Sequence, residues 1–478
     1  MMCQAGSSGF GEDPMKKRKV RGEKSRPAGL SKGLAPMPRN VAGMDIGSRQ
    51  MHVCAPTAEG GPTQVRVFAT TTDEIVACAE WLGQLQVQSV AMESTGVYWI
   101  PVLEIVEGCG FETLLVDTRP LSRVPGRKTD VTDAEWIQTL HSHGLLQGCY
   151  RPTEEISQLR SLVRQKAVLV AEQADWTRRM QKCLDQMNVR AHHAVSDAQG
   201  VTGMLILRAI VAGERDPRKL AGFREEGCHK SREQMAALLS GHWRPDHLFN
   251  LEQGLRMYDA IAERIVVYEG EIQERMKQLT PPGRAEQKAP PLLNAAKRKA
   301  IKRRHQEEKR QALYGRMGVD LTTIDGVGTE TAEAVVSEYG VDMSRFASEK
   351  QFVAHLRLAP RQAISGGRQL KKRGGKTKGT RTGRALRNAA VALGKSASAL
   401  GAYYRRISFH KGASVAVFAT ARKLATLIYR MLRWGQAYVD IGQKAYEDQY
   451  QARRLRSLAS TATQFGYQLV KKTEAVSA

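Results

Sequence analysis

Residues 41–150 alternate short apolar runs with amphipathic stretches, and this alternation restricts the fold more than any other feature of the chain. The predicted order is three strands, helix, strand, helix, strand, helix. The first three strands can form an antiparallel meander because their connections are short, whereas the later strands need parallel crossovers through helices. The sequence therefore predicts a mixed sheet with helices packed on it. The expected strands are 41–46, 51–55, 65–69, 89–92 and 112–116, and the first two expected helices are 72–85 and 98–107.

Four carboxylates lie at the ends of these elements, in a chain that is otherwise strongly basic. Asp45 lies in the first expected strand, and Glu93 comes directly at the end of the fourth, after Met92. Asp130 and Asp133 lie in the first turn of the helix that follows. The chain has 73 Lys and Arg against 48 Asp and Glu, a formal net charge of +25, so these acids are not part of a generally acidic surface. Carboxylates gathered at strand ends hold hard divalent cations against phosphate, which indicates nucleic-acid chemistry.

Three of these acids also have structural explanations when each is taken alone. Asp130 could cap a helix, and Asp133 could be a first-turn residue that the helix dipole favours. Glu93 could cap the helix that follows it. The order of strands and helices around them matches an RNase H-like domain.

Residues 151–280 are helical in pattern almost throughout. Apolar residues recur in alternating steps of three and four, which predicts a coiled coil. We expect this region to support oligomerisation, with packing inside one subunit as the alternative. Only Glu269 interrupts the seam, whose members are Leu248, Leu251, Leu255, Tyr258, Ala262, Ile265, Ile272, Met276 and Leu279.

The segments outside these regions are basic or polar. Residues 1–40 are expected to form a disordered basic tail, and residues 14–20 within it resemble a nuclear-import signal or an added segment. Residues 281–312 are expected to be a basic linker or insertion that contacts nucleic acid, or else a solvated charged face. Residues 446–478 are expected to form a polar, less ordered C-terminal tail. The basic residues of the linker are Lys297, Arg298, Lys299, Lys302, Arg303, Arg304, Lys309 and Arg310.

The seven cysteines include no Cys-x-x-Cys pair, which suits a reducing cytosol rather than a disulfide framework. No apolar run approaches the length of a membrane span, so no membrane association is expected.

Residues 350–439 contain 20 Lys and Arg and no Asp or Glu. Like charges at this density repel one another, and a bound polyanion offsets this repulsion. We therefore expect this stretch to face a polyanion. Within this stretch Ser365 precedes two glycines, so its hydroxyl could approach a phosphorus atom closely, although a turn residue explains the pattern as well. The surrounding unit, 313–445, is expected to be mainly helical. It begins with a Gly326-Val-Gly328 segment that resembles a helix-hairpin-helix turn or a simple helix N-terminus.

Seven short motifs occur in an order found in a known family. Those at the front are Met-Asp-Ile-Gly, Met-Glu-Ser-Thr-Gly-Val-Tyr and Lys-Thr-Asp-Val-Thr-Asp-Ala. Those at the rear are Ile-Asp-Gly-Val-Gly, Leu-Ala-Pro-Arg-Gln-Ala-Ile-Ser-Gly-Gly, Leu-Arg-Asn-Ala-Ala and Ala-Thr-Ala-Arg-Lys-Leu-Ala. Over residues 41–440 the chain resembles the DEDD transposases of bacterial insertion sequences, also called the insertion-sequence 110 family. The resemblance implies a RuvC-like α/β domain of RNase H fold at 41–150, a helical coiled-coil region at 151–280, and a mainly helical transposase domain at 313–445.

The resemblance also implies the chemistry. Asp45, Glu93, Asp130 and Asp133 would bind Mg²⁺, or Mn²⁺ in its place. Ser365 would attack a DNA phosphodiester and form a phosphoserine intermediate. The expected partners are donor and target DNA, a structured noncoding guide RNA called a bridge RNA, and further copies of the chain in a dimer or tetramer. The expected location is the bacterial cytoplasm, at the nucleoid. The basic residues expected to contact the nucleic-acid backbone are Arg127, Lys128, Arg361, Arg368, Lys371, Lys372, Arg373 and Arg384.

Two other functions remain open from the residues. A metal-dependent nuclease or Holliday-junction resolvase would use the acids and water, with Ser365 as a turn residue. A non-catalytic RNA-binding scaffold would need neither the acids nor the serine.

Overall fold

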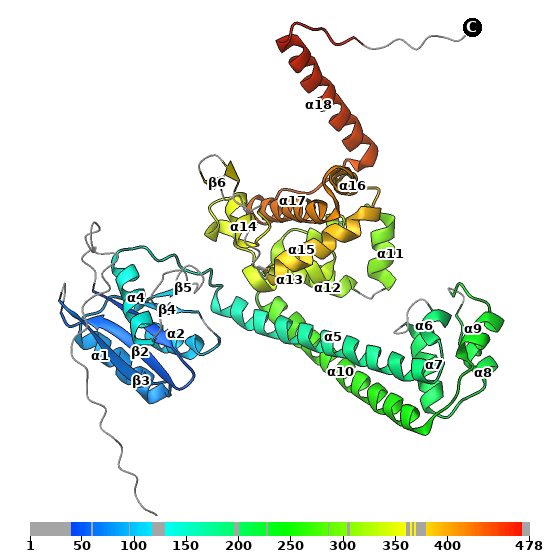
Figure 1. The fold of residues 1–478 in the computed structure, drawn as a ribbon, viewed down its shortest axis with the longest axis horizontal. Helices are drawn as coiled ribbons and strands as arrows, with labels where there is room; N and C mark the ends of the chain where they lie inside the picture. Colours follow the sequence, from blue (N-terminus) through cyan, green and yellow to red (C-terminus); the bar gives the residue numbers. More distant parts are fainter. Residues whose placement is uncertain are drawn as a thin grey trace, which may run out of the picture. The chain divides into compact units, whose positions relative to one another are not determined.

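The computed structural model describes residues 40–58, 61–94, 96–116, 130–195, 200–225, 228–284, 286–303, 306–359, 364–365, 368–369 and 379–470. For residues 130–132, 303, 364–365 and 368–369 it describes the backbone alone. The chain divides into two compact units, residues 1–151 and 152–478 (Figure 1). Residues 1–39 of the expected basic tail lie outside the described residues.

The described strands of the first unit form one five-stranded mixed sheet in the order β3-β2-β1-β4-β5. β1 pairs antiparallel with β2, and β2 with β3, whereas β4 and β5 continue the sheet in parallel. The predicted meander followed by parallel crossovers is therefore confirmed. The strands are β1 (Val41–Ile46), β2 (Gln50–Pro56), β3 (Thr63–Ala69), β4 (Ser89–Glu93) and β5 (Glu112–Val116).

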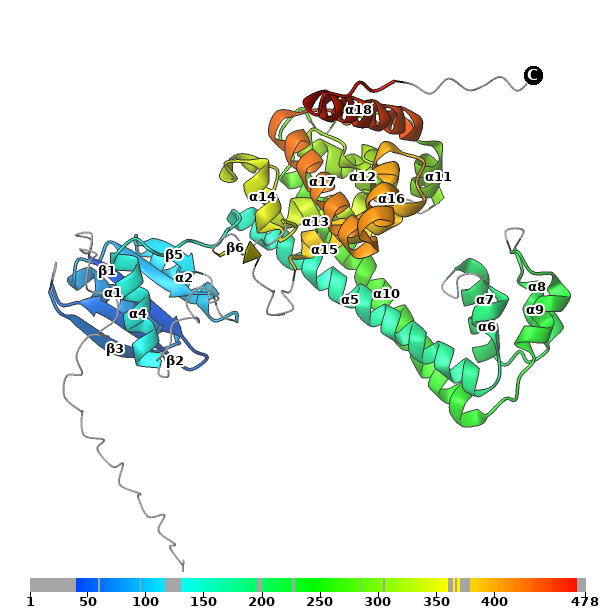
Figure 2. The same cartoon turned by 45° about the horizontal axis from the view of Figure 1, so that its top comes forward.

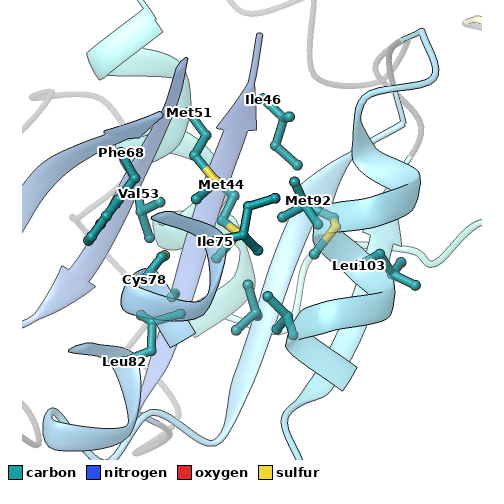
Figure 3. Close-up of a cluster of buried hydrophobic side chains, with 14 of the residues drawn as sticks. Met44, Ile46, Met51, Val53, Phe68, Ile75, Cys78, Leu82, Met92 and Leu103 are labelled. Atoms are coloured by element: carbon teal, nitrogen blue, oxygen red, sulfur yellow. The ribbon is translucent and has the colours of Figure 1, made fainter. Parts of the chain in front are cut away.

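Helices cover both faces of this sheet. α1 (Thr72–Gln84) and α2 (Trp99–Gly108) pack on one face. In Figure 3, Met44 of β1 and Met92 of β4 point into the core, to which Ile75 of α1 and Leu103 of α2 also belong. Full burial of a side chain of this size stabilises the fold by roughly 1.5–3 kcal/mol. α4 (Asp130–Ser142) lies across the opposite face (Figure 2).

Two long helices of the second unit, α5 (Glu154–Gln186) and α10 (Pro245–Gln278), pack side by side and antiparallel (Figure 1). A Cβ atom on Gly254 would lie 2.8 Å from Met180, so glycine allows a close approach near one end of the pair. Toward the other end, Lys166 Nζ lies 3.8 Å from Glu269, which explains the acid that interrupts the apolar seam. The shorter helices α6 (Ala191–Ala194), α7 (Val201–Val211), α8 (Pro217–Gly222) and α9 (Arg232–Leu239) connect the two.

The rest of the second unit is a helical assembly in which α17 contacts several neighbouring helices. None of the helices in the described part of the chain is both long and apolar enough to cross a membrane. The elements are α11 (Ala295–Arg303), α12 (Glu307–Met317), η1 (Leu321–Thr323), α13 (Thr329–Tyr339), η2 (Met343–Arg345), α14 (Glu349–His355), β6 (Ile364–Ser365), β7 (Arg368–Gln369), α15 (Arg381–Ala392), η3 (Leu393–Lys395), α16 (Ala399–Lys411), α17 (Ala413–Trp434) and α18 (Gly442–Gln464).

Two expectations about the polar segments were wrong in part. Residues 446–464 of the expected less ordered tail belong to the helix α18, which packs on α16 and buries Tyr446. Some basic residues of 281–312 are bonded to other parts of the chain rather than directed to solvent or nucleic acid. Arg310 is buried in contact with Asp320, and the Lys297 ammonium donates a hydrogen bond to the carbonyl oxygen of Ile324.

Candidate active site

Asp45 and Glu93 follow paired positions on neighbouring parallel strands. Met44 of β1 lies opposite Met92 of β4, and the next residue along each strand is one of the two acids. Adjacent strands are about 4.8 Å apart, so the two acids lie side by side. Met44 and Met92 point into the core formed with α1 and α2 (Figure 3). Because successive side chains of a strand point to opposite faces, Asp45 and Glu93 both point to the face that α4 covers.

α4 runs antiparallel to β1 across this face. Near the C-terminus of the helix, His141 Nε2 lies 2.9 Å from Ser89 Oγ at the start of β4. One turn earlier, Gln138 Nε2 donates a hydrogen bond of 3.3 Å to the carbonyl oxygen of Val41 at the start of β1. The N-terminus of α4 therefore lies toward the carboxyl ends of β1 and β4, where the two acids lie.

α4 crosses β1 in close backbone contact at Gly43. A Cβ atom on Gly43 would lie 2.6 Å from the carbonyl oxygen of Ala134, so glycine is needed for this approach. Asp130 lies one turn before Ala134, and Asp45 lies two residues after Gly43. These steps cover about 6 Å along the helix and about 6.6 Å along the strand. The crossing thus brings the first turn of α4, with Asp130 and Asp133, to the end of β1 where Asp45 lies.

Asp133 lies on the side of α4 that faces the sheet. It precedes the fully buried Ile137 by one turn, and its Oδ1 is shielded from solvent. The partial positive charge at a helix N-terminus stabilises carboxylates in the first turn. Two residues further along α4, burial raises the pKa of the Glu135 carboxyl above its ordinary value.

His52 is a neighbour of the acids that sequence reasoning missed. It lies directly opposite Asp45 in the antiparallel pairing of β1 with β2, so the two side chains share a face of the sheet. His52 is only 8% exposed. The short connection between the two strands could have indicated this register, because the connection length of a hairpin fixes which residues pair.

The carboxylate oxygens at this end of the sheet are the ligands that a hard divalent cation such as Mg²⁺ prefers. Among the side chains that the structure describes, no three potential ligands are grouped closely enough to hold an ion. Asp130, whose side chain is not among them, is the fourth acid that the α4 crossing adds. The four acids therefore suit such a cation in their chemistry, whereas the side chains that are described do not by themselves form a metal site.

Ser365 lies in a short hairpin of the second unit. β6 pairs antiparallel with β7, and Ser365 is directly opposite Arg368. Gly366 and Gly367 separate the two paired positions in the sequence. The backbone therefore places an arginine position beside the serine position.

Of the basic residues expected at the cut DNA, Arg384 is described with its side chain and is exposed in the first turn of α15. Thr380 caps the N-terminus of this helix, and its Oγ1 accepts a 3.0 Å hydrogen bond from the Gly383 amide. Arg368 is described in its backbone alone. The other candidates, Arg127, Lys128, Arg361, Lys371, Lys372 and Arg373, lie outside the described residues.

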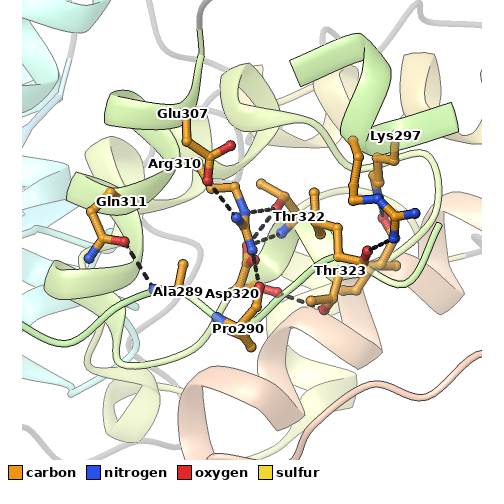
Figure 4. Close-up of polar contacts among 12 residues, drawn as sticks. Ala289, Pro290, Lys297, Glu307, Arg310, Gln311, Asp320, Thr322 and Thr323 are labelled. Atoms are coloured by element: carbon orange, nitrogen blue, oxygen red, sulfur yellow. Dashed lines mark hydrogen bonds and ion pairs between the residues drawn. The ribbon is translucent and has the colours of Figure 1, made fainter. Parts of the chain in front are cut away.

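The turn before α13 is fixed by internal polar contacts (Figure 4). Arg310 donates hydrogen bonds of 2.6 and 2.9 Å to Asp320 Oδ2, and Asp320 Oδ1 accepts a 2.9 Å hydrogen bond from the Thr322 amide. Gly326 has φ +81°, and a Cβ atom there would lie 2.9 Å from the carbonyl oxygen of Ala389 on α15. The packing of the turn on α15 therefore explains this glycine without a bound phosphate.

The strand order β3-β2-β1-β4-β5, with carboxylate positions at the carboxyl ends of β1 and β4, is typical of an RNase H-like domain in an enzyme that acts on nucleic acid. Residues 42–189 match the family model of a DEDD transposase of the IS110 type. Residues 320–405 match the model described as transposase of the IS116/IS110/IS902 family. The chain belongs to the IS110 family of transposases, enzymes that cleave and rejoin DNA. No curated protein matches it.

Proposed function

We propose that this transposase cuts DNA by attack of Ser365 on a phosphodiester, assisted by Mg²⁺ that the four acids hold at the same phosphate. The observation that supports this proposal most directly is the meeting of β1, β4 and the first turn of α4, which brings four carboxylate positions to one end of the sheet. The acids concerned are Asp45, Glu93, Asp130 and Asp133.

The Ser365 hydroxyl supplies the attacking oxygen. A bond forms between Oγ and phosphorus while the bond from phosphorus to the leaving deoxyribose oxygen breaks. The serine proton is released, and the leaving oxygen gains a proton. The hydroxyl of the incoming strand then displaces the serine by the same exchange in reverse. Because one phosphate ester replaces another at each step, rejoining needs no external energy source.

The other residues neutralise and position the phosphate. Bound Mg²⁺ would stabilise the negative charge that develops in the transition state. Arg368, opposite Ser365 in the hairpin, and Arg384 on α15 would hold the DNA backbone rather than read its bases.

Trapping the enzyme on DNA tests the nucleophile. We expect labelled DNA cut in the presence of Mg²⁺ to remain attached to the protein, with the phosphate on Ser365 when the peptides are sequenced by mass spectrometry. Ser365→Ala should abolish both the adduct and the cutting, whereas the matched variant Ser408→Ala, on α16 in the same acid-free stretch, should retain both. Cutting by Ser365→Ala without an adduct would instead support a nuclease that uses water.

We further propose that the site is shared between subunits. The acids belong to the first compact unit and Ser365 to the second, so one complete site can combine parts of two chains. The paired helices α5 and α10 are the candidate oligomerisation element. A mixture of Asp45→Ala and Ser365→Ala proteins should regain activity that neither has alone. No regained activity in hetero-oligomers verified by differential tagging would refute a shared site.

A guide RNA is the last part of the proposal. It is supported by the net charge of +25 and by the acid-free basic stretch, which suit a second polyanion in addition to DNA. The enzyme purified from cells that express its insertion sequence should retain one enriched structured RNA. Recombination by RNA-free enzyme at full rate would contradict this assignment.

A further inference from the structure

α18 packs on α16 through its first turns and is largely exposed beyond them. Tyr446 near its start is buried, whereas Leu455 and Leu458 are 57% and 50% exposed. The picture agrees: the far end of α18 stands clear of the helices below it (Figure 1). A helix that is anchored at one end in this way leaves one side of its middle turns accessible.

A groove of about 570 Å³ lies between α16 and α18. Its lining includes Arg405, Arg406 and Arg454 together with Tyr446 and Tyr450. This volume lies within the range of sites that hold a small organic ligand, roughly 300–1,000 Å³. The groove therefore has both the size and the mixture of aromatic and cationic groups to receive a ligand with a ring and an anion.

Two charged groups of this groove are engaged by the protein itself. Arg405 donates hydrogen bonds of 2.7 Å to the carbonyl oxygen of Ser396 and 2.8 Å to Gln443 Oε1. Glu447, an acid in the lining, accepts a 2.8 Å hydrogen bond from Gln443 Nε2. Arg406 contacts the Tyr450 and Tyr446 hydroxyls and Arg454 contacts that of Tyr450, so both guanidinium groups are held beside neutral partners and keep their charge for a ligand.

Arg406 is held by aromatic rings from both helices. Its guanidinium lies 4.1 Å from the ring centre of Tyr450, 5.5 Å from that of Tyr403 and 5.8 Å from that of Tyr446. These contacts fix the guanidinium at the wall of the groove. They also keep the Tyr450 ring, which is partly exposed, in one orientation.

Positive charge accumulates around the groove. The Lys423 ammonium lies 5.0 Å from the Tyr403 ring centre, and the pKa of Lys423 is below its ordinary value. The first cause is burial, and the next are repulsions by Arg453, Arg406 and Arg430. A group of cations that already repel one another gains most from a polyanion.

We propose that this groove binds a single-stranded stretch of nucleic acid, with a phosphate at Arg406 and Arg454 and a base stacked on Tyr450. The inference rests on the proposed function only in that the enzyme handles nucleic acid. Cationic side chains bind the backbone without regard to sequence, and aromatic rings stack on any base. Leu455 and Leu458 continue the groove with apolar surface on which a further base can lie.

Binding of short fluorescent oligo(dT), oligo(U) and duplex DNA to the full-length Ser365→Ala protein, in EDTA, tests the proposal by anisotropy. This measurement needs no cutting, so its outcome is independent of whether Ser365 is the nucleophile. Arg454→Glu should weaken single-strand binding about tenfold and reduce its salt dependence. Tyr450→Ala should also weaken it about tenfold, whereas Tyr450→Phe should bind as the parent does because it keeps the ring. Arg406 is not varied because it joins the two helices.

Arg456→Glu is the matched control, because Arg456 is exposed on the same helix and does not line the groove. It should weaken binding by about threefold or less, since its distance from the bound phosphate allows screening. Equal losses for Arg454→Glu and Arg456→Glu, or an equal loss for duplex DNA, would overturn the proposal. So would unchanged binding with an altered mass in light scattering, which would assign the groove to a protein contact. A loss confined to oligo(U) supports the groove with RNA as its ligand, and a loss confined to oligo(dT) supports it with DNA.

Discussion

Replacement of Gly43 by alanine is the most direct test of how the acids are assembled. A Cβ atom at this position would lie 2.6 Å from the carbonyl oxygen of Ala134, whereas ordinary contacts begin at 3.4 Å. α4 must therefore move outward by about 1 Å. That movement carries Asp130 and Asp133 away from Asp45 and Glu93, which stay on the sheet.

The expected effects of Gly43→Ala follow from this displacement. Overpacking of this kind costs about 1–3 kcal/mol, which lowers the thermal transition of a unit of this size by roughly 5–20 °C. A misplacement of about 1 Å in a catalytic constellation lowers the rate about 100-fold. Differential scanning calorimetry measures the first effect, and single-turnover DNA cutting, at a temperature where the variant is folded, measures the second.

Gly83→Ala is the matched control for Gly43→Ala. Gly83 lies in α1 of the same unit, and a Cβ atom there would meet nothing within 4 Å. Alanine in a helix is favoured over glycine by about 0.5–1 kcal/mol, so this variant should be as stable as the parent or slightly more stable, with full activity. Parental stability and cutting in Gly43→Ala would refute the close crossing and, with it, the argument that places the acids of α4 beside Asp45.

Three further predictions concern other groups. Glu333 is buried against Lys166 at 2.6 Å and Lys309 at 3.0 Å. Glu333→Gln should therefore destabilise the second unit by about 3–5 kcal/mol in urea unfolding. Glu330→Gln, which alters the exposed partner of Lys309, should cost about 1 kcal/mol or less. Burial lowers the pKa of Lys297 from 10.5 to about 8, and because the unfolded chain then binds the proton more tightly, stability should rise from about pH 8 to pH 10.5. Urea titrations across this range should show that Lys297→Met lacks the rise, and an identical rise in the variant would exclude Lys297 as its source. Removal of divalent cations with EDTA should abolish DNA cutting, and added Mg²⁺ or Mn²⁺ should restore it. Glu93→Gln should raise the Mg²⁺ concentration needed for the half-maximal rate. Cutting in EDTA at the parental rate would exclude a role for the metal.

The pattern of charge in the sequence was insufficient to predict which basic residues are exposed and which pair inside the protein. Residues 281–312 are basic enough to suggest an exposed face, yet Arg310 is 4% exposed and pairs with Asp320. A charge run has the same appearance in the sequence whether its members meet solvent, nucleic acid or a buried acid. The deciding contacts come from other elements, and burial of an unpaired charge would be unfavourable without them.

The candidate site also combines features that the sequence was sufficient to predict with features that depend on the tertiary structure. The alternation in 41–116 was sufficient to predict all five strands, because apolar runs, turns and short connections are local properties. It also placed Asp45 and Glu93 at the ends of strands. The short β1–β2 connection could have indicated that His52 lies opposite Asp45, but no local pattern indicates that α4 crosses the sheet at Gly43, because that crossing depends on the direction of a helix after a long connection.

The sequence by itself determined a mixed sheet followed by helices, the four candidate acids, the basic stretch and the family resemblance, because each is expressed in residue types and their spacing. Only the tertiary structure decided which of these residues meet. Lys166 and Glu333 are 167 positions apart in the chain and 2.6 Å apart in space. Asp45 and Asp130 are brought to one end of the sheet by a glycine that no pattern singled out. The physical reason is that the partner of a charge depends on contacts between distant segments, and these are fixed only when the core packs.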